Sequence, residues 1–355
     1  MALDSTNPAE VNDDWNRDRE SFDDEVRRRG MVGYWMIPTR SIGFREPKAS
    51  YAPRLWTWQS LREIAYAAVD HVPKEEAHRR FVGLQHPDLK LGTAPHYYLG
   101  CQLLKAREKA PAHRHTMDAI RFVVQGSGGA HTSNDGEPFP MHKWDLVTTP
   151  NWCWHDHVNE SDEDTIWLDG AVSPLINHFG AGFSEPYEGD NFHPRTRPVE
   201  WSNANAGALR PRGARPAGPR QRGHRYPWAE TARVLETLAD SPADPFDDIV
   251  LTYTDPFTGG PVLPTLGSEI QRLRARFNGR AHRHVHATTY HVLEGEGVSE
   301  IGDTTFEWKE GDTFVVPIWT WHRHRNPGAR SALLYSIDDS PVVRALGFDR
   351  EEVEK

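Results

Sequence analysis

This chain of 355 residues has few cysteines, no long apolar run and no excess of positive charge. Its two cysteines, Cys101 and Cys153, are too few for the disulfide framework of a small secreted domain. No apolar run approaches the roughly 18 residues that a membrane-spanning helix needs. Residues 1–29 are acidic and polar, without the basic start and apolar core of a signal peptide. We therefore expect a cytoplasmic protein that does not enter a membrane.

The charge balance excludes a further class of partner. The formal net charge is −10 at pH 7, which argues against nucleic acid as a principal partner. Hydrophobic residues make up 37% of the chain, an ordinary value for a soluble enzyme. A chain of this length suggests roughly two domains, each large enough to bury its own core.

One histidine signature occurs twice along the chain. Each copy has two histidines separated by a single residue and a third histidine farther on: His113, His115 and His155 in the first copy, and His282, His284 and His322 in the second. On a β-strand, residues i and i+2 point the same way, so each pair can converge on one ion. Three neutral imidazoles can hold a metal and leave coordination positions open. The repeat therefore predicts two β-barrels that can each bind a metal.

The duplication extends beyond the histidines. The same spacings before the third histidine separate Asp145, Pro150, Trp152 and Trp154 in the first copy and Asp312, Pro317, Trp319 and Trp321 in the second. Short apolar stretches with glycine turns follow each histidine pair, which is typical of a β-sandwich or barrel. One turn differs, because Trp144 stands where the second copy has Gly311. Tryptophan does not readily adopt a positive φ, so we expect this turn to differ in shape.

Composition divides the chain into five stretches. Residues 1–90 mix charge with helical periodicity and predict an N-terminal helical segment that covers the first barrel. The first barrel is expected over 91–180, the second over 246–345, and a tail over 346–355. Between the barrels, residues 181–245 are rich in proline, glycine and arginine and predict a linker with a short helix near 228–238. Arginines among prolines in an acidic protein more often solvate a loop or contact a subunit than bind nucleic acid.

Four segments accompany the histidines in a fixed order. They are Pro-Ala-His-Arg-His-Thr at 111–116, Trp-His-Asp-His at 154–157, Trp-Leu-Asp-Gly at 167–170 and Thr-Gly-Gly-Pro-Val-Leu-Pro-Thr at 258–265. Over about residues 75–345 the chain resembles the cupin superfamily, and within it the bicupin ring-cleaving dioxygenases. This is the gentisate 1,2-dioxygenase group with its salicylate, 5-nitrosalicylate and hydroxynaphthoate relatives.

The resemblance implies both a fold and a reaction. The fold is mainly β: a bicupin with two double-stranded β-helix (jelly-roll) barrels, flanked by N-terminal and linker helices. The reaction is an Fe(II)-dependent, extradiol-type cleavage between C1 and C2 of a 2-hydroxybenzoate, as in the degradation of aromatic compounds. It uses O2 as co-substrate and one Fe(II) in the N-terminal cupin. The family also implies a homo-oligomer, either a tetramer or a dimer.

A difference between the two copies indicates which barrel is catalytic. Arg121 in the first copy corresponds to Tyr290 in the second, and it shares the strand face of the histidine pair. A buried guanidinium beside a metal is costly unless an anion meets it, and a substrate carboxylate is a natural partner. The alternative is an ion pair with Asp118 or Asp169. We expect catalysis in the first barrel, with His113, His115 and His155 as the iron ligands.

The resemblance assigns roles to further residues in this barrel. His157 would handle the proton of the substrate hydroxyl, and Asp169 would be a nearby acid that could orient His157. The expected substrate contacts are Arg121, Arg79, Gln102, Tyr98 and Met117. Alternatives stay open for several: His157 as a water-exposed strand end, Gln102 and Tyr98 as simple core packing, and Arg80 in place of Arg79.

Two side chains just after the first histidine pair bear on the metal and on specificity. Many cupins add a glutamate ligand there, whereas this chain has Asp118, which fits that position poorly. The site is therefore expected to contain three histidines without a carboxylate. Met117 replaces the glutamine usual in gentisate enzymes and cannot hydrogen-bond a 5-hydroxyl. We expect a salicylate with another 5-substituent, such as nitro or halogen, to be a substrate besides gentisate.

The second triad and two rival functions remain open on sequence grounds. His282, His284 and His322 keep ligand spacing without a substrate-binding charge, so they either hold a structural metal or form a polar cluster. The rivals are a non-oxidative, metal-dependent cupin isomerase or decarboxylase, and a non-catalytic bicupin that binds a ligand.

Overall fold

The computed structural model describes residues 18–37, 46–73, 79–187, 191–205 and 222–354. The chain divides into two compact units, Met1–Lys48 and Ala49–Lys355. The arginine-rich part of the predicted linker, residues 210–216, lies outside the described residues, as do residues 1–17 of the predicted N-terminal segment. Among the residues that are described, no helix is both long and apolar enough to cross a membrane.

The described residues of the first unit, 18–37 and 46–48, form one helix and one turn of 3₁₀-helix. Helix α1 (Arg19–Arg28) begins after Asp18, whose side chain accepts a hydrogen bond from the Glu20 amide at 3.1 Å. The 3₁₀-helix η2 (Tyr34–Met36) returns against it: the Trp35 indole donates to Asp23 Oδ1 at 2.8 Å. The aromatic rings of Phe22 and Trp35 stack with their centroids 6.1 Å apart.

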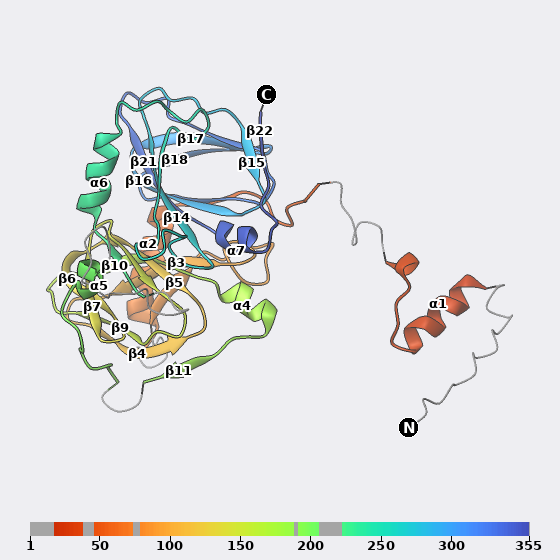
Figure 1. Cartoon of the computed structure of the whole chain (residues 1–355), viewed down its shortest axis with the longest axis horizontal. Helices are drawn as coiled ribbons and strands as arrows, with labels where there is room; N and C mark the ends of the chain where they lie inside the picture. Colours follow the sequence, from red (N-terminus) through yellow and green to blue (C-terminus); the bar gives the residue numbers. More distant parts are fainter. Residues whose placement is uncertain (1–17, 38–45, 74–78, 188–190, 206–221, 355) are drawn as a thin grey trace. The chain divides into compact units, whose positions relative to one another are not determined.

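The second unit consists of two β-barrels, each made of a six-stranded and a five-stranded sheet (Figure 1). In the first barrel the six-stranded order is β12 (Arg225–Tyr226), β8 (Leu146–Thr149), β5 (Ala119–Gln125), β10 (Thr165–Ala171), β3 (Tyr98–Leu104) and β2 (Arg80–Gly83). Its five-stranded order is β11 (Ser184–Pro186), β4 (Lys109–His115), β9 (His155–Asn159), β6 (Ser127–Asn134) and β7 (Glu137–His142). All the pairings within these sheets are antiparallel.

The second barrel repeats this arrangement. Its six-stranded order is β1 (Arg54–Trp56), β19 (Thr313–Val316), β16 (Thr288–Glu294), β21 (Ala332–Asp338), β14 (Gly267–Leu273) and β13 (Ile249–Thr252). Its five-stranded order is β18 (Thr304–Lys309), β17 (Glu296–Ile301), β20 (His322–Arg325), β15 (His282–His284) and β22 (Glu351–Val353). The mainly β, two-barrel architecture expected from the sequence is confirmed.

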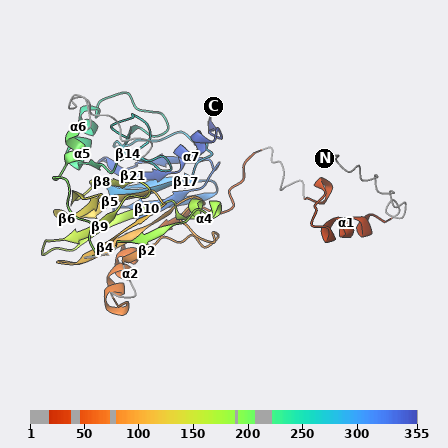
Figure 2. The same ribbon diagram turned by 60° about the horizontal axis from the view of Figure 1, so that its bottom comes forward.

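Helices flank the barrels, and several short strands lie where none was expected. Within the part of this unit that the structure describes, the helices are α2 (Trp58–His71), α4 (Ser173–Phe179), α5 (Trp201–Asn205), α6 (Trp228–Thr237) and α7 (Ser340–Ala345). Helix α2 lies against β2 and β3 of the first barrel (Figure 2). The stretch predicted as helical also contains β1 and β2, and β1 pairs with β19 of the second barrel. The predicted linker supplies β11 and β12, and the predicted tail supplies β22.

The expectation about the Trp144 turn is wrong. Trp144 adopts φ 69° and Gly311 adopts φ 87°, so both copies use the left-handed conformation. The same backbone hydrogen bonds hold the two turns, from Trp144 N to Val123 O at 2.6 Å and from Gly311 N to Val292 O at 2.8 Å. Packing offsets the cost of a tryptophan in this conformation, because its ring meets Trp228 edge-on at a centroid distance of 4.8 Å.

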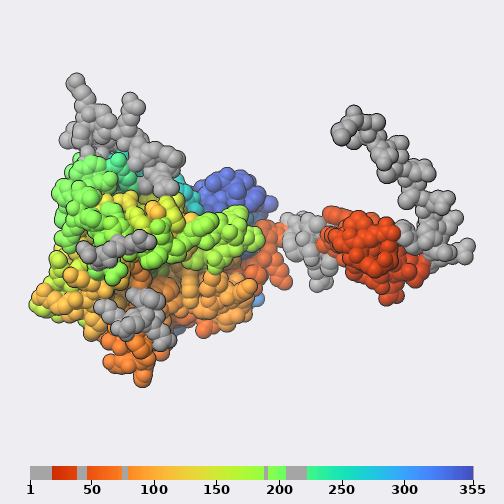
Figure 3. Space-filling view, turned by 90° about the horizontal axis from the view of Figure 1, so that it is seen from below, coloured from red at the N-terminus to blue at the C-terminus, as the bar shows by residue number. Residues whose placement is uncertain are grey.

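The barrels share one hydrophobic core through their six-stranded sheets. The Phe122 ring of β5 stacks on Tyr335 of β21 at a centroid distance of 3.8 Å. At the same interface the Tyr97 hydroxyl lies 2.8 Å from Thr289 Oγ1. Gly170 of β10 permits this close approach, since a Cβ at that position would lie 2.5 Å from Ile337 Cδ1. The face seen in Figure 3 belongs mainly to the first barrel and the segments around it.

Candidate metal centre and substrate cavity

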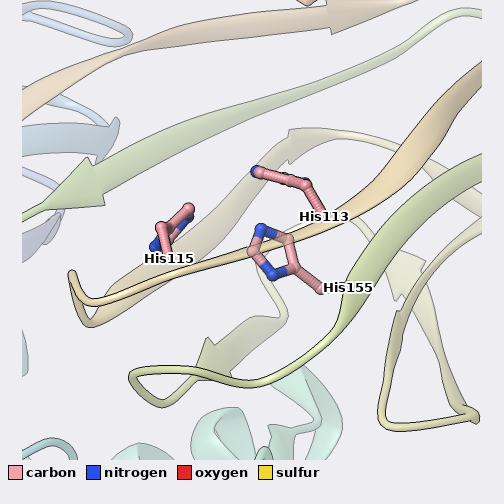
Figure 4. Close-up of side chains that lie close together, drawn as sticks. All are labelled: His113, His115 and His155. Carbon is pink, nitrogen blue, oxygen red and sulfur yellow. The ribbon is translucent and has the colours of Figure 1, made fainter. Parts of the chain in front are cut away.

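The first histidine triad assembles on two paired strands of the five-stranded sheet. His113 and His115 are two residues apart on β4, so their side chains project from the same face of the strand. His155 is the first residue of β9 and lies directly opposite His113. Their possible ligand atoms all lie within 4.8 Å of one another. Figure 4 shows the three rings gathered from these two strands. The structure therefore brings together the three residues for which metal binding was predicted.

Hydrogen bonds set the tautomers of two of these rings. Nδ1 of His115 lies 2.9 Å from the Met117 carbonyl, and Nδ1 of His155 lies 2.9 Å from the Cys153 carbonyl. A carbonyl only accepts, so Nδ1 carries the proton in both rings and Nε2 carries the lone pair. In the described part of the chain, the buried Nε2 of His155 has no hydrogen-bond partner. This donor set fits a divalent transition metal.

All three imidazoles are held in the uncharged form that binds metals. Burial, reinforced by the nearby Arg79, lowers the pKa of His113 to about 2. Burial and then Arg121 lower the pKa of His115 to about 4. The pKa of the fully buried His155 also lies well below its usual value, first because of burial and then because of His113.

The acid next to the triad is engaged elsewhere. The Asp118 carboxylate accepts hydrogen bonds from the backbone N–H of Asn151 at 2.7 Å and from Thr265 Oγ1 at 2.6 Å. Among the described residues, the cluster that could hold the ion contains the three histidines alone. Asp118, in the turn between β4 and β5, instead joins the segment that precedes β9 to a segment of the second barrel.

The triad borders a cavity of about 260 Å³ inside the first barrel. Nine of the predicted site residues line it: Arg79, Tyr98, Gln102, His113, His115, Met117, Arg121, His155 and Asp169. Four lining residues were not predicted: Phe81, Ala119, Ala171 and Ser173. Alternation along β5 and β10 could have found the two alanines, because each lies two residues from a predicted site residue. Phe81 also lies two residues from a predicted residue, Arg79, but Arg79 precedes strand β2, and Ser173 carries no such signal.

Two guanidinium groups make this cavity electropositive. Arg121 is only 1% exposed; it donates to Thr149 Oγ1, and its Nε lies 3.8 Å from Asp169 Oδ2. That Nε has no hydrogen-bond partner among the described residues. Arg79 contacts His113 Nδ1 and donates to the Pro111 carbonyl at 2.8 Å. Burial, and then repulsion by Arg121, lowers the pKa of Arg79 to about 9.

Arg121 and Arg79 each had an alternative role or rival: an ion pair for Arg121, and Arg80 in place of Arg79. Arg121 does approach Asp169, its cross-strand neighbour, but this ion pair is long and leaves Nε without a hydrogen bond. Arg80 points away from the cavity lining and forms an ion pair with Glu108. Arg79 is therefore the arginine of this pair that faces the triad.

His157 lies behind the triad, and its partner differs from the expected one. Its ring is fully buried, and Nδ1 lies 2.9 Å from Thr132 Oγ1, which rules out the alternative of a water-exposed strand end. Asp169, which was expected to orient His157, instead accepts from the Trp167 indole at 3.3 Å. Strand register explains this, because Thr132 of β6 stands directly opposite His157 while Asp169 stands opposite Arg121.

The second triad also assembles. His282, His284 and His322 place their possible ligand atoms within 4.8 Å of one another, and all three are buried.

Comparison with known proteins agrees with this geometry. The Cupin domain family model matches residues 101–170 and 271–338. The chain is 37% identical to 5-aminosalicylate 1,2-dioxygenase from Comamonas sp. over 346 residues, 96% of this chain and 91% of that protein. It is 36% identical to gentisate 1,2-dioxygenase 1 from Aquipseudomonas alcaligenes, over 94% of this chain and 96% of that protein. The crystal structure of salicylate 1,2-dioxygenase from Pseudaminobacter salicylatoxidans superposes with a TM-score of 0.84 at 30% identity, covering 98% of this chain and 99% of that one.

Proposed function

The chain belongs to the gentisate and salicylate 1,2-dioxygenase family of ring-cleaving bicupins, and we propose that an iron(II) ion held by His113, His115 and His155 serves its reaction. It is a dioxygenase that inserts O2 between C1 and C2 of a 2-hydroxybenzoate. Iron(II), when bound to these three imidazoles, would supply the Lewis acidity and the redox chemistry of that step. One ion would serve each N-terminal barrel.

The observation that carries this proposal is the pair of guanidinium groups beside the triad, of which Arg121 is buried and Arg79 is half-buried. Arg79 and Arg121 line the same cavity as the histidines, and Asp169 is the acid that lines it with them. Two positive charges in one cavity, with a single carboxylate beside them, favour an anion as the third partner. A 2-hydroxybenzoate brings a carboxylate and an ortho hydroxyl on one ring edge, so the arginines can orient it while the hydroxyl faces the triad.

Other side chains would position the substrate and receive its proton. The unpaired Nε of Arg121 would donate to the carboxylate. His157 is uncharged because burial, and then Arg121, hold its pKa well below the usual value. Its Nε2 has no partner in the described structure, and it would accept the proton of the substrate hydroxyl. Tyr98 and Gln102 would contact the ring from β3.

Met117 supports a proposal about the substrate's 5-position. Its thioether lines the cavity and offers no hydrogen-bond donor to a 5-hydroxyl. One relative is named for 5-aminosalicylate and another for gentisate, so the family accepts different groups at this position. We propose that this enzyme acts on 5-substituted salicylates such as 5-nitrosalicylate, as well as on gentisate.

Oxygen consumption tests the proposal against both rival functions. Protein loaded with Fe(II) is mixed with a panel of 2-hydroxybenzoates, and O2 uptake and aromatic absorbance are followed together. We expect O2 uptake with loss of the aromatic band, and neither in the His155→Ala variant. His142→Ala, which removes an exposed histidine of the same barrel, is the matched control. A product formed without O2 uptake would favour an isomerase or decarboxylase, and binding without turnover would favour a binding protein.

We also propose a cellular location and an oligomeric state for the enzyme. Both cysteines are buried and free, which suits a reducing cytoplasm. A homo-oligomer, either a tetramer or a dimer, is proposed from family membership.

A further inference from the structure

The second barrel contains a buried histidine cluster that the proposed reaction does not use. His282 of β15 pairs directly with His322 of β20, and their Nε2 atoms lie 2.7 Å apart. His284 projects from the same face of β15 as His282. All three are buried, and His322 is 1% exposed. Three polar rings inside a barrel are costly unless their nitrogens are matched by partners.

Backbone carbonyls orient two of these rings as in the first barrel. Nδ1 of His284 lies 2.8 Å from the His286 carbonyl, and Nδ1 of His322 lies 3.0 Å from the Thr320 carbonyl. Since a carbonyl only accepts, both rings carry the proton on Nδ1 and direct the Nε2 lone pair inward. These two contacts reproduce those of His115 and His155. Both barrels therefore hold two histidine rings in the orientation that a metal ligand needs.

The third ring faces an acid. Nδ1 of His282 lies 3.7 Å from Asp247 Oδ2 and has no hydrogen-bond partner among the described residues. A proton on Nδ1 would face this carboxylate, and the lone pair of Nε2 would then join the other two. An imidazole held between a carboxylate and a metal is a common arrangement in metal sites.

The surroundings of this cluster favour a cation and disfavour an anionic substrate. Asp244 and Glu351 act electrostatically on His282, whereas Arg79 and Arg121 surround the first triad. The cross-strand pair Arg121 and Asp169 of the first barrel corresponds to Tyr290 and Ser336 here. The Tyr290 ring is buried and packs against His324 at a centroid distance of 4.7 Å.

We propose that His282, His284 and His322 bind a second divalent transition-metal ion, of the type that prefers imidazole, which supports the second barrel without taking part in ring cleavage. The site goes beyond the proposed function and does not depend on it. The ion would join β15 to β20, two strands whose register contains one residue pair, His282 with His322. It would therefore contribute to the stability of the five-stranded sheet.

The test counts metal ions in the full chain. Protein stripped of metal is equilibrated with Co²⁺, and bound cobalt per chain is measured by elemental analysis and by visible absorption. We expect two ions in the wild type, one in His155→Ala and one in His322→Ala. The control is His291→Asn, which removes a buried histidine of the second barrel that lies outside the triad; it should still bind two.

The His155→Ala chain decides the question even if His322→Ala fails to fold, because its second barrel is unaltered. One bound Co²⁺ in that chain, with a rise of a few degrees in melting temperature on adding Zn²⁺, supports the proposal. No bound ion and no thermal shift would overturn it. Oxygen uptake by the wild type reports separately on the first barrel, so the two proposals can fail independently.

Discussion

At the scale of single residues, the two triads have the same ligands and opposite surroundings. Arg121 and Arg79 make the first cavity electropositive, whereas Asp247 faces the second triad. The difference arises at a few strand positions, since an arginine in one copy is a tyrosine in the other. The side chains around the histidines, rather than the histidines themselves, therefore determine which barrel can catalyse the reaction.

Replacing Arg121 tests the carboxylate contact. Removal of a buried, charge-assisted hydrogen-bond partner costs about 3–4 kcal/mol, so Arg121→Ala should lower kcat/KM for 2-hydroxybenzoates by about 100- to 1000-fold. Arg121→Lys should recover only part of the loss, because lysine keeps the charge without the planar fork. The measurement is steady-state O2 uptake, with the exposed Arg62→Ala as control. An unchanged kcat/KM in folded Arg121→Ala would show that the arginine only pairs with Asp169.

Replacing Met117 tests the 5-position. Met117→Gln adds a donor worth about 1 kcal/mol to a matching hydroxyl, and the kcat/KM ratio of gentisate to 5-chlorosalicylate should rise roughly tenfold at most. Met117→Leu keeps an apolar side chain of similar volume and should leave the ratio near the wild-type value. If Met117→Gln leaves the ratio unchanged as well, this side chain does not face the 5-position.

Several site residues were predictable because strand alternation is local. His113, His115 and Arg121 share a face, and nine of the predicted residues line one cavity. Partners that depend on register between distant strands were not predictable. Thr132, rather than Asp169, meets His157 because β6 lies beside β9, and no sequence pattern indicates that neighbour. Phe81 reaches the cavity only because β2 pairs with β3.

At the scale of elements, the two barrels are completed by strands from unexpected places. Strand β1 precedes the first barrel in sequence yet lies at the edge of the second, and β22 from the tail lies beside the histidine strand β15. The helices α2 and α6 were predictable from composition and periodicity. Strands such as β1, β11, β12 and β22 have three residues or fewer, too few to show an alternating pattern.

A contact between the loop before β3 and the second barrel should make stability depend on pH. His96 Nδ1 lies 2.5 Å from Asp339 Oδ2, and this hydrogen bond raises the pKa of His96 above its usual value. A raised pKa in the folded state means that the contact stabilises fully below the unfolded pKa of about 6.5 and is lost as pH rises through the folded pKa.

The variant His96→Asn should therefore be less stable than the wild type at pH 5.5 and nearly equal to it at pH 9. Because the His96 side chain is 40% exposed, the difference should not exceed about 1 kcal/mol. Denaturant unfolding at the two pH values measures it, and His142→Asn serves as the exposed control. A gap that widens with rising pH would contradict this sign.

At the scale of the whole molecule, the barrels share a core and should unfold together. Phe122 is fully buried and stacks on Tyr335 across the interface, so Phe122→Ala should cost about 3–5 kcal/mol. Because the lost contact belongs to both barrels, a single denaturant transition should shift as a whole. Phe183→Ala, at a phenylalanine that is 65% exposed, should change little. Two separated transitions would show that the barrels fold independently.

The central claim is that one barrel catalyses and the other supports it. The most direct measurement compares O2 uptake by His155→Ala and His322→Ala, both loaded with Fe(II), assayed with the same 2-hydroxybenzoate and corrected for folded protein. The account predicts background uptake in His155→Ala and substantial turnover in His322→Ala. Turnover that survives in His155→Ala and disappears in folded His322→Ala would contradict it.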